Sequence, residues 1–227
     1  MLRLLASLLV ASAFANAAET EWPTYGHDPG GMRFSPLEQI TPANVSQLEP
    51  AWTYHLRKTK NGVQPSRFLP SQVTPLVVAG VMYLTSPYNE VIALDAATGE
   101  EIWVFDTREV GQPARRGLEY WPGDREHPPR IFFGTRDGKL VALDAKRGTA
   151  IESFGERGAV DLKTPDVMNG YPKALYAVTS PPVIYKNLVI TGSMTQEQPA
   201  HGAAGDVRAW DAVTGKHVWT FHTVPRP

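Results

Sequence analysis

Short stretches of alternating apolar and polar residues recur along this chain, and three of them follow one plan. In each, an alternating segment ends in an aspartate, a glycine follows four residues later, and a second alternating segment begins. The pairs are Asp95 with Gly99, Asp144 with Gly148, and Asp211 with Gly215. An aspartate side chain can bond to the backbone of a turn, and glycine accepts a positive φ. Each unit therefore predicts a β-hairpin whose aspartate is structural.

Around the first hairpin, residues 71–106 contain four short alternating segments, which is the pattern of one four-stranded blade. Repeated blades of this kind form β-propellers. No stretch of the globular part keeps a helical period for three turns, so the predicted fold class is all-β, a β-propeller represented by about three blades. A propeller ring buries its edges only when it closes. We therefore expect this chain to be the N-terminal part of a longer propeller.

The spacing between the repeated aspartates exceeds the roughly 40 to 45 residues of a bare blade. The additional residues fall in two segments rich in proline, glycine and charge, 107–130 and 156–173. Long loops on a rigid scaffold often carry functional residues. Before the first blade, an irregular segment ends in residues 51–56, which alternate as a single strand would. We expect that strand to complete the last blade of the ring.

The N-terminus has the composition of a secretory signal peptide, assigned to residues 1–17, with the propeller domain at 18–227. Arg3 precedes an apolar stretch, and small residues at 15 and 17 suit cleavage. This predicts export to a bacterial periplasm; a short membrane anchor is the alternative. After the signal, no apolar run is long enough to span a bilayer.

The composition excludes several classes of function. The formal net charge is −1, and basic residues are interspersed with acidic ones, which argues against a nucleic-acid partner. The chain has no cysteine, so disulfides do not contribute to stability. The six histidines show no paired metal-ligand spacing, and neither a phosphate-binding glycine loop nor a nucleophile elbow is present.

Three motifs point to one family. They are the N-terminal Trp-Pro-Thr-Tyr-Gly-His-Asp with Arg-Phe-Ser-Pro-Leu, the repeated Ala-x-Asp-x-x-x-Gly followed by Trp103 and Trp219, and the segment from Arg116 to Asp124, Arg-Gly-Leu-Glu-Tyr-Trp-Pro-Gly-Asp. With these motifs the chain resembles the N-terminal part of the PQQ-dependent quinoprotein dehydrogenases, eight-bladed propellers that oxidise alcohols or sugars. The middle repeat has Glu152 where the family has tryptophan, so we expect one docking contact to be missing.

The resemblance implies two cofactors, pyrroloquinoline quinone (PQQ) and Ca²⁺. PQQ is a planar quinone with three carboxylates, which a guanidinium can grip bidentately, and Arg116 matches the family's cofactor-binding arginine. An ion pair within the loop is the alternative for Arg116. The other implied cofactor-binding residues are Gln72, Thr179, Thr195 and Gln196, and Glu197 is the implied metal ligand. The alternative for Glu197 is a solvated loop glutamate.

Two departures leave the substrate open between an alcohol and a sugar. Gln72 stands where many relatives have glutamate, and Gln112-Pro-Ala replaces both the alcohol branch's cysteine pair and the sugar branch's histidine. The resemblance implies hydride transfer to the quinone and a cytochrome c or ubiquinone as electron acceptor. The family's base comes from a later blade, so no catalytic residue is assigned. A cofactor-free scaffold propeller of the outer-membrane assembly type and an inactive remnant are the alternative functions.

Overall fold

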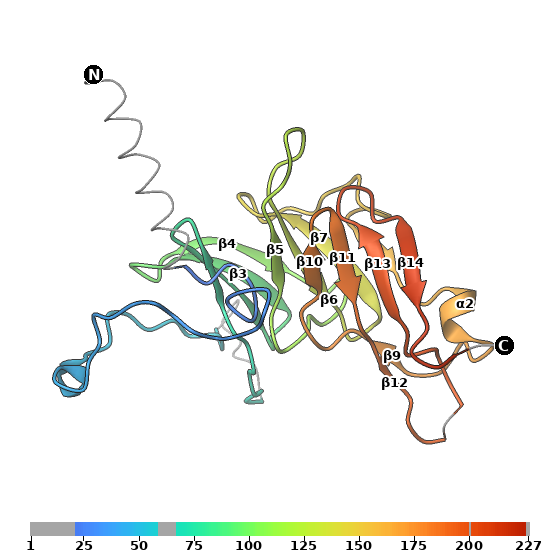
Figure 1. The fold of residues 1–227 in the computed structure, drawn as a ribbon, viewed down its shortest axis with the longest axis horizontal. Helices are drawn as coiled ribbons and strands as arrows, with labels where there is room; N and C mark the ends of the chain where they lie inside the picture. The colour runs from blue at the N-terminus through green and yellow to red at the C-terminus, as the bar shows by residue number, and fades with distance from the viewer. Residues whose placement is uncertain (1–20, 59–66, 200, 226–227) are drawn as a thin grey trace.

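The computed structural model describes residues 21–58, 67–199 and 201–225, and their regular structure is almost entirely β. Three four-stranded antiparallel sheets follow one another along the chain (Figure 1). This arrangement confirms the all-β prediction with three repeated units. The predicted signal peptide, residues 1–17, lies outside the described residues. No helix in the described ranges is long and apolar enough to cross a membrane.

In the first two sheets the strands are ordered as in the sequence. The first sheet consists of β1 (Leu76–Val78), β2 (Val81–Ser86), β3 (Glu90–Asp95) and β4 (Glu101–Asp106). The second consists of β5 (Glu119–Trp121), β6 (Arg130–Gly134), β7 (Lys139–Asp144) and β8 (Ala159–Asp161). The alternating pattern predicts a first strand from Val73, but β1 begins after Pro75, which has no N–H for the ladder.

The third sheet is interrupted by a separate strand pair. It consists of β10 (Val183–Tyr185), β11 (Leu188–Thr191), β13 (Val207–Asp211) and β14 (His217–Phe221). Between β11 and β13 the chain forms β12 (Met194–Thr195), which pairs with β9 (Tyr176–Ala177). The only helices of the described residues are α2 (Pro165–Met168) and the 3₁₀ turn η1 (Val45–Gln47).

The repeated aspartates are structural, as predicted. Asp95 Oδ1 accepts hydrogen bonds from the N–H groups of Ala97 and Thr98, at 2.9 and 2.8 Å. Asp144 and Asp211 accept the equivalent pairs of turn N–H groups. The glycines that follow have φ of 74°, 67° and 74°. Aspartate and glycine together therefore close each hairpin.

Aromatic rings pack directly on two of these glycines. Trp52 lies on Gly99 and Trp103 lies on Gly148, so that an added Cβ would come within 2.5 and 2.4 Å of the rings. Each indole Nε1 also donates to a turn carbonyl: Trp52 to that of Ala96 at 3.2 Å, and Trp103 to that of Ala145 at 3.0 Å. Trp103 belongs to the first sheet and its glycine to the second, so this contact joins the two sheets.

No tryptophan packs on the third glycine within the described residues, in agreement with the expectation from Glu152. The Cβ position of Gly215 lies 2.6 Å from Val160 Cγ2 and 3.2 Å from the ring of Phe154. The backbone N–H of Gly155 donates to the carbonyl of Thr214 at 3.0 Å. Phe154 is fully buried in a core that includes residues of both the second and the third sheet. The second and third sheets are therefore joined here by aliphatic, aromatic and backbone contacts in place of a tryptophan.

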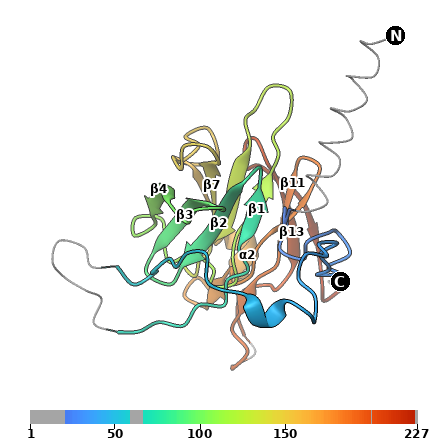
Figure 2. The same cartoon turned by 90° about the vertical axis from the view of Figure 1, so that its left-hand side faces the viewer.

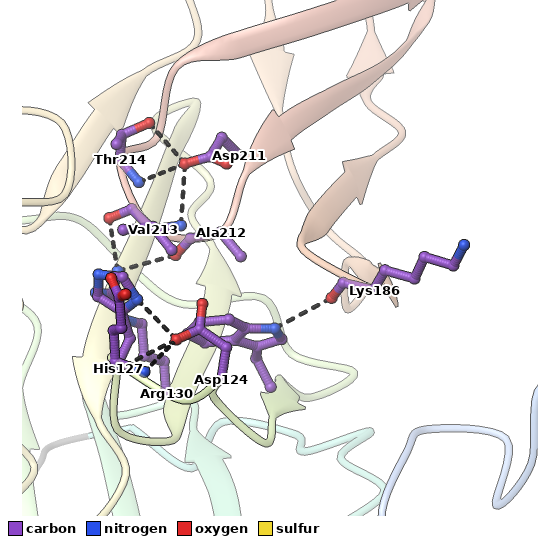
Figure 3. Close-up of polar contacts among 10 residues, drawn as sticks. Asp124, His127, Arg130, Lys186, Asp211, Ala212, Val213 and Thr214 are labelled. Carbon is purple, nitrogen blue, oxygen red and sulfur yellow. Dashed lines mark hydrogen bonds and ion pairs between the residues drawn. The ribbon is translucent and has the colours of Figure 1, made fainter.

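Arg130 provides a second link between these two sheets (Figure 3). From β6 its NH1 donates to the carbonyls of Ala212 and Val213 in the third hairpin turn, at 2.9 and 2.7 Å. The guanidinium lies 5.5 Å from the centroid of the Trp121 ring, whose Nε1 donates to the carbonyl of Lys186. Trp121 is 1 % exposed. Trp121 is therefore a packed core residue at the junction of the two sheets.

Residues 51–56 form no ladder among the described residues, and because the partner of this predicted strand was expected in the last blade of the ring, the strand stays a prediction. The segment exchanges no backbone hydrogen bonds with a neighbour among the described residues. Alternation makes a segment suitable for a sheet, but a strand needs a partner to complete its ladder. What orders this segment is the side chain of Trp52 on the first hairpin.

The N-terminal residues pack on the first two sheets and then leave them. Trp22 exchanges two backbone hydrogen bonds with Val77 of β1. The segment that follows carries η1 and extends away from the sheets (Figures 1 and 2). Several of its large apolar side chains are exposed, among them Met32, Phe34, Ile40 and Leu48.

Glu119 of β5 joins the N-terminal segment to the second sheet. One carboxylate oxygen accepts from the backbone N–H of Tyr25 at 3.3 Å, and the side chain is 2 % exposed. Burial raises the pKa of Glu119 to about 7, despite hydrogen bonds from Thr24, Tyr25 and Tyr120 that lower it. The folded state therefore holds a proton here at pH values where the unfolded chain has lost it.

We predict that this proton makes stability depend on pH. Because the pKa of Glu119 is raised by folding, the free energy of unfolding should fall as pH rises from about 4.5 to about 7, by up to roughly 3 kcal/mol. Glu119→Gln should remove this component and be the more stable protein above pH 7. Thermal melts at several pH values check this, with Glu126→Gln on an exposed loop as control. An unchanged pH slope in Glu119→Gln would contradict the assignment.

Candidate functional site

Three of the sequence-predicted cofactor residues occupy equivalent places in the three sheets. Gln72 precedes β1, Arg116 precedes β5 and Thr179 precedes β10, each by three or four residues. These strands are the first of their sheets, at the edge opposite β4, β8 and β14. Repetition of the sheet therefore brings the same position of each unit to one place.

The structure brings these three side chains to a common cavity of about 240 Å³. Its lining residues are Gln72, Arg115, Arg116, Arg136, Thr179 and Met194. The cavity therefore combines three cationic side chains, an amide and a hydroxyl, and none of the described residues that line it carries a carboxylate. Such a donor set suits an anionic ligand, because guanidinium groups are hydrogen-bond donors that remain charged when desolvated.

Arg116 is held at the cavity by contacts with the segments that precede β10 and β1. Its NH1 donates to Ser180 Oγ at 3.0 Å, next to Thr179. Its carbonyl accepts from the N–H of Thr74 at 3.2 Å, which ties it to the segment that carries Gln72. Gly117 follows with φ of 134°, and a Cβ there would lie 3.2 Å from the Thr74 carbonyl oxygen. Glycine thus permits the close approach that positions the arginine.

Two cavity arginines were missed by the sequence analysis. Arg115 is half-buried, and its Nε is buried without a hydrogen-bond partner in the described part of the chain. Arg136 lies in the turn between β6 and β7, where its N–H donates to the carbonyl of Gln112 at 2.9 Å. The position of Arg115 next to Arg116 in the sequence could have indicated that its side chain reaches the same cavity. Nothing local marked Arg136, because a charged hairpin turn is ordinarily solvated.

The predicted residues after β11 are placed differently. Met194 lines the cavity, whereas Thr195, Gln196 and Glu197 are not among its lining residues. Thr195 pairs with Tyr176 in the β9–β12 ladder. Gln196 Nε2 donates to the carbonyls of Pro199 and His201, at 3.2 and 3.4 Å. That amide lines a second, shallower cavity of about 550 Å³ beside Tyr171 and Lys173.

Glu197 is exposed in the loop that follows β12. Within the described ranges, no three His, Cys, Asp or Glu side chains gather as a metal-binding group. Glu197 could supply one carboxylate to a hard cation such as Ca²⁺, which prefers six to eight oxygen ligands. The roles of Thr195, Gln196 and Glu197 stay predictions.

A buried ionic network lies at the end of the same connection. Arg208 and Asp206 are 1 % and 4 % exposed, and Arg208 NH2 donates to Asp206 Oδ2 at 3.1 Å. The same carboxylate oxygen lies 3.0 Å from His222 Nδ1, and Arg208 NH1 donates to the carbonyl of Ala204. Burial raises the pKa of Tyr176, which pairs with Thr195 at the start of this loop. The network thereby links both ends of the loop that carries Glu197.

The comparison with protein families decides the assignment. The sequence model of the PQQ glucose/ethanol/alcohol dehydrogenase β-propeller domain matches residues 22–227. This chain belongs to that quinoprotein family. The three sheets are therefore part of a β-propeller, and the resemblance drawn from the motifs is confirmed.

Curated relatives in the family include both sugar and alcohol dehydrogenases. The quinoprotein glucose dehydrogenase of Escherichia coli is 35% identical over 93% of this chain and 28% of its own length. The quinone-linked alcohol dehydrogenase subunit of Gluconacetobacter polyoxogenes is 39% identical over 91% of this chain and 26% of its own. The chain thus spans about a quarter of the length of these relatives.

Solved structures agree with the family assignment. The quinohemoprotein alcohol dehydrogenase from Comamonas testosteroni superposes with a TM-score of 0.71 at 32% identity, covering 93% of this chain and 28% of that one. A europium-containing methanol dehydrogenase gives a TM-score of 0.63 at 26% identity, covering 89% of this chain and 32% of that one. The matched quinoproteins thus differ in substrate and in the redox or metal groups that their names record.

We predict that the Arg208 network is needed for a stable third sheet. Removing one partner of a buried ion pair typically costs about 3–5 kcal/mol, so Arg208→Met should lower the free energy of unfolding by that order. The double variant Arg208→Met/Asp206→Asn should recover part of the loss, because it also removes the buried negative charge that has lost its guanidinium. Urea denaturation of the full-length protein measures both. Equal losses in the single and double variants would contradict this account.

Proposed function

We propose that the full protein is a periplasmic PQQ-dependent dehydrogenase that oxidises an alcohol or sugar hydroxyl by hydride transfer to the quinone. The observation that carries the proposal is the cavity shared by Gln72, Arg116 and Thr179, which come from three successive sheets. The family assignment supports oxidoreductase chemistry on CH–OH groups. The signal-like residues 1–17 support the periplasmic location.

The side chains at this cavity fit PQQ. Its carboxylates need cations and hydrogen-bond donors, and the described lining residues supply guanidinium, amide and hydroxyl groups but no carboxylate. Among the residues that the structure describes, the buried Nε of Arg115 has no hydrogen-bond acceptor, as expected of a site whose ligand is an anion. When bound, PQQ supplies the hydride acceptor.

Each chain residue has a binding role in this proposal. Arg116, oriented by Ser180 and Thr74, grips a carboxylate; Thr179 donates a hydroxyl hydrogen bond; Gln72 offers an amide donor where relatives offer a carboxylate. Thr195 and Gln196 belong to the loop that borders the cofactor, and Glu197 supplies a ligand to Ca²⁺. The catalytic base and the remaining metal ligands are expected from later blades.

The small-molecule partners follow from the same proposal. The substrate is an alcohol or sugar, and electrons pass to a periplasmic or membrane acceptor, a cytochrome c or ubiquinone. The alternative of a cofactor-free scaffold predicts no use for a cavity lined by three arginines. That observation favours the dehydrogenase.

The decisive experiment tests Arg116 in the full-length protein reconstituted with PQQ and Ca²⁺. Dye-linked oxidation of alcohols and sugars should appear on reconstitution, and Arg116→Gln should lower it about 10- to 100-fold, because one charged hydrogen-bonding contact is lost. Arg125→Gln, on the exposed loop 122–129, is the matched control and should leave activity unchanged. Wild-type activity in Arg116→Gln would overturn the arginine's role, and no activity in any reconstituted sample would overturn the proposed function.

A further inference from the structure

Three guanidinium groups surround one small cavity, although only one of them was expected there. Arg115 and Arg116 are consecutive, and Arg136 comes from the turn between β6 and β7. None of the three forms an ion pair within the described residues. Three like charges around about 240 Å³ repel one another, and an anion between them relieves that repulsion.

The backbone holds the two additional arginines against the same segment. Arg136 N–H donates to the Gln112 carbonyl at 2.9 Å, and Asp137 Oδ2 accepts from the Gln112 N–H at 3.3 Å. The turn is thereby fixed beside residues 112–116, and its acidic residue is occupied by a backbone contact and does not line the cavity. Arg136 alone of this turn contributes a charge to the cavity.

Arg115 provides the second, independent observation. Its side chain lines the cavity while its Nε is buried and makes no hydrogen bond in the described part of the chain. A buried unsatisfied donor costs free energy that a bound acceptor would recover, and the recovery is larger when the acceptor is charged. One carboxylate on Arg116 would leave this donor unused. The arrangement suits a ligand with more than one carboxylate.

We propose that Arg115 and Arg136 bind further carboxylates of the cofactor, so that this chain holds the tricarboxylate by three guanidinium groups. The inference rests on the proposed function and assigns two residues that it does not use. It also explains how cofactor binding is compatible with Gln72 at a position where many relatives have glutamate. The amide adds no negative charge beside the cofactor's own carboxylates. In this arrangement the three guanidinium groups recognise the carboxylates of the cofactor and not its quinone.

The test compares two probes, PQQ and its trimethyl ester, which keeps the ring system but has no carboxylate. Equilibrium dialysis against the full-length apoprotein in calcium buffer measures both affinities for the wild type, Arg115→Gln, Arg136→Gln and the double variant. Each single change should weaken PQQ binding by about ten-fold and leave ester binding within about two-fold. Arg125→Gln is the matched control and should bind both probes as the wild type does.

The outcomes separate this inference from the proposed function. A wild-type protein that does not bind PQQ overturns the proposed function and this inference with it. A wild type that binds PQQ, with Arg115→Gln and Arg136→Gln matching Arg125→Gln, overturns this inference alone. If the glutamine variants unfold at a lower temperature than the wild type, Arg115→Lys and Arg136→Lys replace them, because lysine keeps the charge. The wild-type preference for PQQ over its ester then still decides, since equal affinities for the two probes overturn the inference.

Discussion

An aromatic ring lying on a glycine turn is the contact on which the arrangement of sheets depends. Trp52 on Gly99 and Trp103 on Gly148 both show it. Glycine is required twice over, because the turn needs a positive φ and because any Cβ would occupy the space of the ring. Since Trp103 comes from the first sheet and Gly148 from the second, this contact also orients the two sheets relative to each other.

The buried hydrophobic cores also join neighbouring sheets. One core joins Leu76 and Val91 of the first sheet to Ile131 and Val141 of the second. Another joins Phe132 of the second sheet to Val189 and other residues of the third. Each sheet is too small to bury both of its faces alone, so the apolar surface is covered by the adjacent sheet. Arg130 and Trp121 add polar links where the middle repeat has no docking tryptophan.

Because the sheets repeat in orientation, equivalent positions before their first strands converge. Gln72, Arg116 and Thr179 reach one cavity for that reason, and the hydrogen bonds from Thr74 to Arg116 and from Arg116 to Ser180 connect them. The cavity residues thus lie just before the first strand of each sheet. The loop that carries Glu197 is instead attached to the β9–β12 pair and to the Arg208 network.

The sequence by itself determined whatever depends on a few consecutive residues. The Asp–Gly hairpins, the all-β class, the structural aspartates and the family motifs could all be predicted, because turn chemistry and strand alternation are local. Tertiary structure decided the rest. Val160 and Phe154 pack at Gly215 where the middle repeat has no tryptophan, and Gln196 lines a different cavity from Arg116. Arg136 joins Arg115 and Arg116 only because two separate turns meet in space, and no pattern along the chain records that distance.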